Sequence, residues 1–199
     1  MIFRFLRVAI PVVALVVSVS SCAAGPPPAP AAAVDVPPPP TTAAPAVGQS
    51  ERGLLIKRPG DVAQFGVTQD ALTVKFVVDK ITVDPKCSGG AAQQAENGHL
   101  VKLDLRAETT PELPASSNFY IVGGDWSVVG PDGVTESEVW TMPAASCLPS
   151  KQLFPSDPLS PASKYRGSII LDTRSASGVA MFRPGFMSDH GGWEWSFPA

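Results

Sequence analysis

The sequence contains few of the residues from which metal centres and catalytic sites are built. Among 199 residues there are three cysteines and two histidines, whereas a protein metal centre usually takes three or four ligands. The chain also lacks a Gly-x-Ser-x-Gly elbow, a Gly-rich phosphate loop ending in Lys-Ser or Lys-Thr, and a His-Glu-x-x-His motif. We therefore expect a protein that is not an enzyme and that holds no metal and no cofactor.

Positive charge is also in short supply. The chain has 15 Lys and Arg residues against 18 Asp and Glu residues, which gives a net charge of −3 at pH 7. Both Arg4 and Arg7 precede Cys22, so a chain cut before Cys22 would keep 13 basic and 18 acidic side chains, a net charge of −5. Binding to nucleic acid, or to a membrane through a basic patch, needs an excess of Lys and Arg. The composition argues against both.

No apolar run in the sequence reaches the length of an ordinary membrane span. Val8–Val19 is almost wholly apolar, but about 20 apolar residues are needed to cross the hydrocarbon core. This run follows the positively charged Met1–Arg7 and precedes the small residues Ser20 and Ser21. Such an arrangement is typical of a secretory signal. We predict that residues 1–21 are a signal peptide and not a transmembrane anchor.

The cysteine that follows this signal has a specific context. Val19-Ser20-Ser21-Cys22 resembles a bacterial lipobox, in which an aliphatic residue and two small residues precede a cysteine that becomes lipidated. The resemblance implies that Cys22 is the acylated first residue of a lipoprotein at the outer face of the cell membrane, since several acyl chains together anchor a protein stably. The alternative is an ordinary signal peptide cleaved nearby, with Cys22 left as a free thiol.

Proline is abundant, but much of it lies in one stretch. Nine of the 22 prolines fall between Ala23 and Ser50, in a segment made mostly of Ala and Pro. The segment lacks the large apolar side chains that offset the entropy cost of ordering, and its prolines favour extended conformations. We predict that residues 22–52 are a disordered tether that holds a folded domain, residues 53–199, away from the membrane.

The predicted domain shows the alternation of β-strands. Apolar residues occupy alternate positions from Leu72 to Val78, and the phase then slips to Ile81 and Val83, which predicts a β-bulge near Asp79-Lys80. Further strands are predicted over Val101–Ala107, Phe119–Val122, Asp125–Val129, Tyr165–Leu171, Val179–Phe182 and Trp193–Phe197. No segment has sustained helical periodicity. Seven or eight short strands predict an all-β fold, an antiparallel sandwich with a small barrel as the alternative.

Cys87 and Cys147 are the two cysteines of the predicted domain. Export places them in an oxidising compartment and their number is even, so we predict a disulfide between them. Both lie in loop-like contexts, Pro85–Gly90 and Ala144–Pro149. A redox-active pair is the weaker alternative, because the sequence has no Cys-x-x-Cys motif.

A loop near the C-terminus carries the most site-like polar residues. Asp189-His190 is followed by Gly191-Gly192 and then by Trp193, and an acid beside a histidine on a Gly-rich loop suits metal binding or proton transfer. The only other histidine is His99, so a surface loop that leads into the last strand is the simpler interpretation.

The aromatic residues around that loop admit two interpretations. Trp193, Trp195 and Phe197 share one face of the predicted last strand, and we expect Trp195 and Phe197 to close the core. An exposed apolar patch at the start of the strand would instead serve a ligand or partner. The candidate patch consists of Phe186, Met187, His190 and Trp193.

The order of these segments is similar to that of a known family. Gly98–Arg106 resembles the early central strand, and Phe119–Gly133 the next hairpin, of the bacterial telokin-like domain family of unknown function. Arg166–Asp172 and Gly178–Gly185 resemble its late strand pair, and Gly192–Pro198 its terminal strand. The resemblance implies the immunoglobulin-like sandwich that this family shares with the immunoprotective extracellular proteins. The family offers no catalytic residues to transfer, and a fold alone does not give a function.

Together these features predict a lipid-anchored protein of the bacterial cell envelope whose β-sandwich is a non-enzymatic binding module for another envelope protein. The first alternative is a carrier or sensor of a small apolar or lipidic ligand, held between the sheets or under the loop Phe186–Trp193. A cavity of several hundred Å³ lined by aromatic rings would favour that alternative, and a packed core would not. The second alternative is an envelope enzyme with a dispersed site.

Overall fold

The computed structural model describes residues 48–68, 70–187 and 191–198. The chain divides into two units between Thr41 and Thr42, and every described residue belongs to the second unit. The predicted signal peptide, Cys22, most of the predicted tether and His190 lie outside the described residues. Within the described ranges, no helix has the length and apolar character that a membrane crossing requires.

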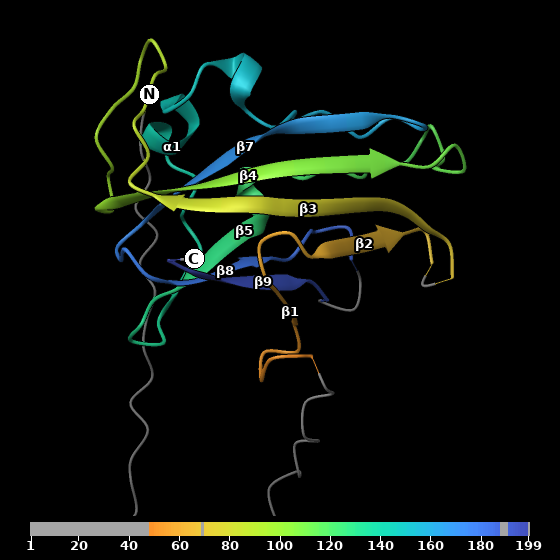
Figure 1. Cartoon of the computed structure of the whole chain (residues 1–199), viewed down its shortest axis with the longest axis horizontal. Coiled ribbons are helices and arrows are strands. Elements are labelled where there is room, and N and C mark those ends of the chain that lie inside the picture. The colour runs from red at the N-terminus through yellow and green to blue at the C-terminus, as the bar shows by residue number, and fades with distance from the viewer. Residues whose placement is uncertain (1–47, 69, 188–190, 199) are drawn as a thin grey trace, which may run out of the picture. The chain divides into compact units, whose positions relative to one another are not determined.

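Two sheets build the domain (Figure 1). The four-stranded sheet is antiparallel throughout and has the order β2-β3-β4-β7. Its strands are β2 (Val62–Gly66), β3 (Leu72–Val83), β4 (His99–Thr109) and β7 (Lys164–Thr173). The five-stranded sheet has the order β1-β9-β8-β5-β6, with β1 parallel to β9 and the other neighbours antiparallel. Its strands are β1 (Leu55–Lys57), β5 (Trp126–Val129), β6 (Thr135–Glu136), β8 (Gly178–Phe182) and β9 (Trp193–Phe197).

The two facing layers confirm the predicted immunoglobulin-like β-sandwich. The described residues form nine strands, one or two more than expected. Three strands escaped prediction: β1 and β6, which have only three and two residues, and β2, which has five. In β2 only Ala63 and Phe65 are buried, which is too little alternation to separate a strand from a loop by sequence.

The predicted bulge in β3 is present. Val78 pairs with Leu105 and Lys80 pairs with Asp104, so Asp79 is the extra residue in the ladder with β4. The insertion places both Val78 and Ile81 on the core side, where they are 0% and 6% exposed. The unpaired Asp79 therefore explains why the alternation of apolar residues shifts by one position in the sequence.

One predicted strand is wrong. Phe119–Val122 pairs with no strand; Phe119 instead accepts a backbone hydrogen bond from Leu159, and a 3₁₀ turn, η1 (Gly123–Asp125), leads into β5. The apolar residues of this segment pack against the end of the sandwich. They are buried although the segment pairs with no strand, and this burial explains why the sequence resembles a strand.

Two short helical segments were also missed. They are the helix α1 (Met142–Ser146), capped by the Thr141 hydroxyl, which accepts from the Ala144 N–H, and the 3₁₀ turn η2 (Ser150–Gln152). Five residues are too few to display a 3.6-residue period.

Aromatic rings fill the space between the sheets. Phe76 makes edge contacts with Phe182 and Trp193, with ring centroids 5.5 and 5.2 Å apart, while Trp126 stacks on Phe182 at 4.9 Å. Trp195 is 0% exposed. Phe197 is also buried, which confirms the prediction that these two residues of β9 close the core. Large rings bury much apolar surface, and they stabilise a sandwich of this size effectively.

Candidate binding site

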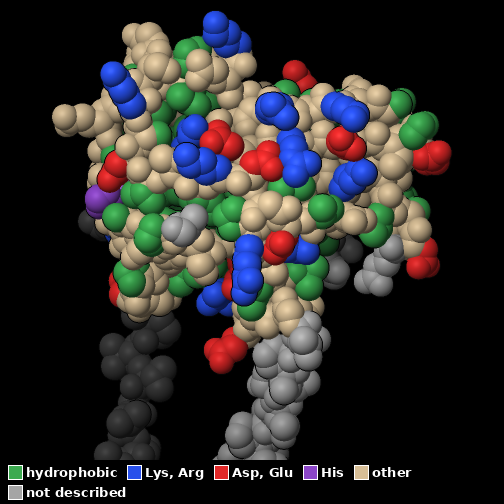
Figure 2. Space-filling view, viewed as in Figure 1, with side chains coloured by type: hydrophobic (Ala, Val, Ile, Leu, Met, Phe, Trp, Pro, Cys, Tyr) green, Lys and Arg blue, Asp and Glu red, His purple; other side chains and the backbone are tan. Residues whose placement is uncertain are grey.

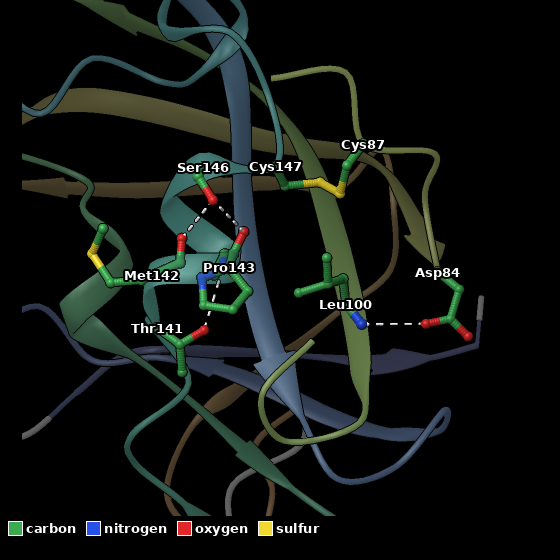
Figure 3. Close-up of a disulfide and its surroundings, with 9 residues drawn as sticks. Asp84, Cys87, Leu100, Thr141, Met142, Pro143, Ser146 and Cys147 are labelled. Carbon is green, nitrogen blue, oxygen red and sulfur yellow. Dashed lines mark hydrogen bonds between the residues drawn. A yellow bond between two sulfur atoms is a disulfide. The ribbon is translucent and has the colours of Figure 1, made fainter. Parts of the chain in front are cut away.

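The disulfide between Cys87 and Cys147 is formed, as predicted. It joins the loop after β3 to the residue that follows α1, and it lies beside the ribbons of β4 and β7 (Figure 3). Beneath it, Leu100 and Ile170 form a small apolar cluster with Ala144 and Leu148 on the outer face of the four-stranded sheet. The bond therefore links two loops over one end of that face.

A cleft opens at the end of the sandwich where β9 begins. It has a volume of about 620 Å³. We call it the end cleft; its lining includes the aromatic residues Phe65, Phe119, Phe186 and Trp193, together with Met187, Leu55, Val67 and Leu72. Three of the four residues of the candidate patch, Phe186, Met187 and Trp193, are therefore brought together.

The aromatic wall of the end cleft is a continuous cluster. The ring centroids of Phe119 and Phe186 are 4.8 Å apart, and Phe65 lies 5.1 Å from Phe186 and 6.0 Å from Trp193. Trp193 itself is 2% exposed and belongs to the core, whereas Phe186 and Met187 are partly buried and pack against that core. The wall is thus held rigidly from behind by the sandwich.

The rim of the end cleft is aliphatic and open to solvent. Leu55, Val67 and Leu72 are 40%, 58% and 45% exposed. They come from β1, from the turn after β2 and from the start of β3, so both sheets contribute to one apolar edge. Exposed aliphatic side chains gathered around a cleft are typical of contact surfaces.

Two aromatic residues of this wall were not among the site residues predicted from the sequence. Phe65 lies in the unpredicted strand β2, and Phe119 lies in the segment wrongly predicted as a strand. The only available signal was a lone aromatic residue in a short apolar segment, and such a residue can face a core or a cleft equally well.

Neither histidine forms a metal site in the part of the chain that is described. His190 lies outside the described residues, while His99, at the start of β4, pairs its Nδ1 with Asp84 Oδ2 at 2.9 Å. Within residues 48–68, 70–187 and 191–198, no three His, Cys, Asp or Glu side chains are grouped so as to hold a metal ion.

Outside the apolar cluster beneath the disulfide, the outer face of the four-stranded sheet is polar and rich in cations. Figure 2 shows Lys and Arg side chains interspersed with Asp and Glu over this part of the surface. The ion pairs include Arg106 with Asp79 at 2.8 Å, Lys102 with Asp104 at 3.1 Å, and two lysines, Lys75 and Lys164, that share Glu108. Exposed pairs of this kind contribute little to stability.

Comparisons with known proteins give a likeness among solved structures but not among family models or curated proteins. No family model matches the chain, and no curated protein matches it. Among solved structures, the chain is similar to MPT63, a secreted protein from Mycobacterium tuberculosis, with 12% identity and a TM-score of 0.42 over 78% of this chain and 99% of that one. The assignment of a β-sandwich rests on the sheet topology described above, and membership of the telokin-like family stays a prediction.

Proposed function

We propose that this protein is an exported, membrane-tethered and non-enzymatic binding module that contacts an envelope protein through the end cleft. The observation that carries the proposal is the rigid aromatic wall of Phe65, Phe119 and Phe186 behind an exposed aliphatic rim. A preorganised apolar cleft limits the entropy lost on binding, and buried aromatic contacts at the centre of an interface provide most of its affinity. The tether is expected to start at a lipidated Cys22.

A second candidate function is the transport or sensing of a small apolar ligand. The volume of about 620 Å³ favours it, because small-molecule sites usually occupy between about 300 and 1,000 Å³. The space between the sheets does not favour it, since the rings of Phe76, Phe182, Trp126 and Trp195 fill that space. In this second candidate function the apolar ligand would therefore occupy the end cleft and not the space between the sheets.

Site-specific cross-linking in intact cells tests the first candidate. A photoreactive amino acid at Leu72, on the rim, is expected to capture a defined protein. The matched control is Val134, which is 50% exposed and lies in the turn that follows the far end of β5. If both positions capture the same background of neighbours, the end cleft is not the partner surface.

Native mass spectrometry of the protein released from its host's membrane distinguishes the second candidate. A small-molecule adduct that disappears in Leu72→Asp would support a carried ligand, since the added charge lies at the rim of the cleft. A bare domain together with a specific cross-link at Leu72 would support the binding module alone.

A further inference from the structure

A second cleft lies along the edge strand β7 and shares no lining residue with the end cleft. It is bounded by α1, by residues 150–157 and by β7, and its volume is about 640 Å³. We call it the side cleft; its apolar lining includes Ile121, Trp140, Phe154 and Ile170, and its charged lining includes Lys151 and Arg166.

Trp140 is an exposed indole that is nevertheless held in place. Its ring is packed so closely on Gly123 that a Cβ atom at that position would collide with the ring's Cδ1. The indole is 58% exposed, whereas Trp126, Trp193 and Trp195 are at most 2% exposed. A large aromatic surface left open beside an apolar cleft is suited to contact with a ligand.

The position of Trp140 is fixed through its neighbour in the chain. The Thr141 hydroxyl donates a 2.7 Å hydrogen bond to the carboxylate of Asp172, which is 0% exposed. The same carboxylate accepts the backbone N–H groups of Glu96 and Asn97 at 2.8 and 2.9 Å. Breaking such a buried charge network is costly, so the wall of the side cleft is preorganised.

Two basic side chains are shared by the side cleft and a neighbouring polar groove. Lys151 and Arg166 line both the side cleft and a groove of about 600 Å³ on the outer face of the four-stranded sheet. Among the ion pairs of the described residues, none includes Lys151 or Arg166. The acids of the groove, Asp79 and Asp104, are already paired with other cations, and Asp157 is the acid of the side cleft.

The pairing of β4 with β7 adds to the positive potential at this point. Arg106 and Arg166 are direct cross-strand partners, and like charges in that position destabilise a sheet. Asp79 neutralises Arg106 at 2.8 Å, whereas Arg166 faces the cleft and the groove without an ionic partner among the described residues. An anion bound there would relieve the repulsion.

We propose that the side cleft binds a single anionic amphiphile, with its apolar chain against Trp140, Phe154 and Ile170 and its carboxylate or phosphate on Arg166 and Lys151. The apolar cleft and the cationic ridge are contiguous because they share these two cations. A guanidinium binds a carboxylate or phosphate through two hydrogen bonds, which an alcohol or an ammonium group cannot accept in the same way. This site is independent of the partner surface proposed for the end cleft.

Calorimetric titration of the full chain with four twelve-carbon probes, each below its micelle concentration, tests this inference. Dodecanoate and dodecyl phosphate are expected to bind. The probe with the lower dissociation constant identifies whether the site prefers a carboxylate or a phosphate headgroup. Dodecanol and dodecyltrimethylammonium are expected to bind at least about tenfold more weakly, because they cannot form the charge-assisted hydrogen bonds. Binding of dodecanoate should also shift the emission of the exposed Trp140 to shorter wavelength, and Trp140→Phe should remove that shift.

Charge variants locate the headgroup. Lys151→Gln combined with Arg166→Gln should weaken dodecanoate at least about tenfold and leave dodecanol unchanged. Arg58→Gln combined with Lys80→Gln removes the same total charge from exposed positions outside both linings, and it should have little effect. Equal affinity for dodecanoate and dodecanol, unaltered binding in the Lys151/Arg166 variant, or loss of dodecanoate binding in Leu72→Asp at the end cleft would overturn the assignment.

Discussion

Arg52, the last residue of the predicted tether, is bound to Glu194 in the last strand of the domain. The Arg52 side chain donates from Nε and Nη2 to the two carboxylate oxygens of Glu194, each at 3.1 Å, and Ser50 donates to the same carboxylate at 3.0 Å. Glu194 is 5% exposed although it lies in β9 on the side opposite the core tryptophans. This contact, together with the pairing of β1 with β9, fixes the point at which the predicted tether meets the domain.

Substitution of Arg52 should destabilise the domain. Arg52→Ala leaves the buried Glu194 carboxylate with only the Ser50 donor, and the free energy of unfolding should fall by about 1–3 kcal/mol. Urea denaturation followed by tryptophan emission measures this change. The matched control is Arg58→Ala. Arg58 is exposed and directly follows β1, so its substitution should change the stability little. Equal effects of the two substitutions would contradict a specific role for the Arg52–Glu194 pair.

Loss of the disulfide should be more costly. The bond spans a sequence separation of 60 residues, and on the chain-entropy model a loop of that size contributes about 4 kcal/mol by restricting the unfolded chain. We expect the paired substitution Cys87→Ala with Cys147→Ala to lower the midpoint of thermal unfolding under non-reducing conditions. Reduction of the wild-type protein should reproduce the loss and should leave the paired variant unaffected. A reductant that lowers both midpoints equally would show that another cause is at work.

Asp125 should make stability depend on pH. Burial raises the pKa of the Asp125 carboxyl above its usual value of 3.8, and the Gly185 N–H opposes this shift only in part. A raised pKa means that the folded state prefers the neutral acid. The stabilisation is therefore fully present below pH 3.8 and is lost as the pH rises through the higher pKa of the folded state.

Asp125→Asn removes this ionisation. Compared with the wild type, the variant should be more stable at neutral pH, and the difference should vanish below the usual pKa of 3.8. Urea denaturation at a series of pH values measures it. Asp70→Asn, at an exposed position, controls for the loss of one carboxylate from the surface. A variant that is less stable than the wild type at neutral pH would show that the charged carboxylate is needed for folding.

Cys22 should decide where the protein is found. If it is the acylated first residue, Cys22→Ser will move the protein from the membrane fraction to the soluble fraction of the native host, because the acyl chains provide the anchor. Intact mass spectrometry should show the loss of the lipid mass in the same variant. Ser21→Ala, which keeps a small residue before the cysteine, is the control and should remain in the membrane fraction. Unchanged fractionation and mass in Cys22→Ser would remove the lipid anchor from the proposed function.

Local patterns predicted the strands well where the alternation was long. The bulge in β3 and the inward faces of β4, β7 and β9 follow from the period of two, because each side chain of a strand must face either the core or the outside. The same rule failed for Phe119–Val122, where apolar residues are buried by a loop. It also failed for Glu194, whose place in the alternation suggests exposure but whose carboxylate is buried by Arg52.

The sequence by itself determined the sandwich, the disulfide and the expectation of export, since each depends on short-range signals: alternation, an even number of cysteines, and a charged and then apolar N-terminus. Only the tertiary structure decided which residues meet at the two clefts. Phe65, Phe119 and Trp193 line one cleft, and Arg166, Lys151 and Trp140 line the other, although they come from distant segments of the chain. Such contacts depend on how the two sheets and their loops pack, and packing at the ends of a sandwich leaves no periodic trace in the sequence.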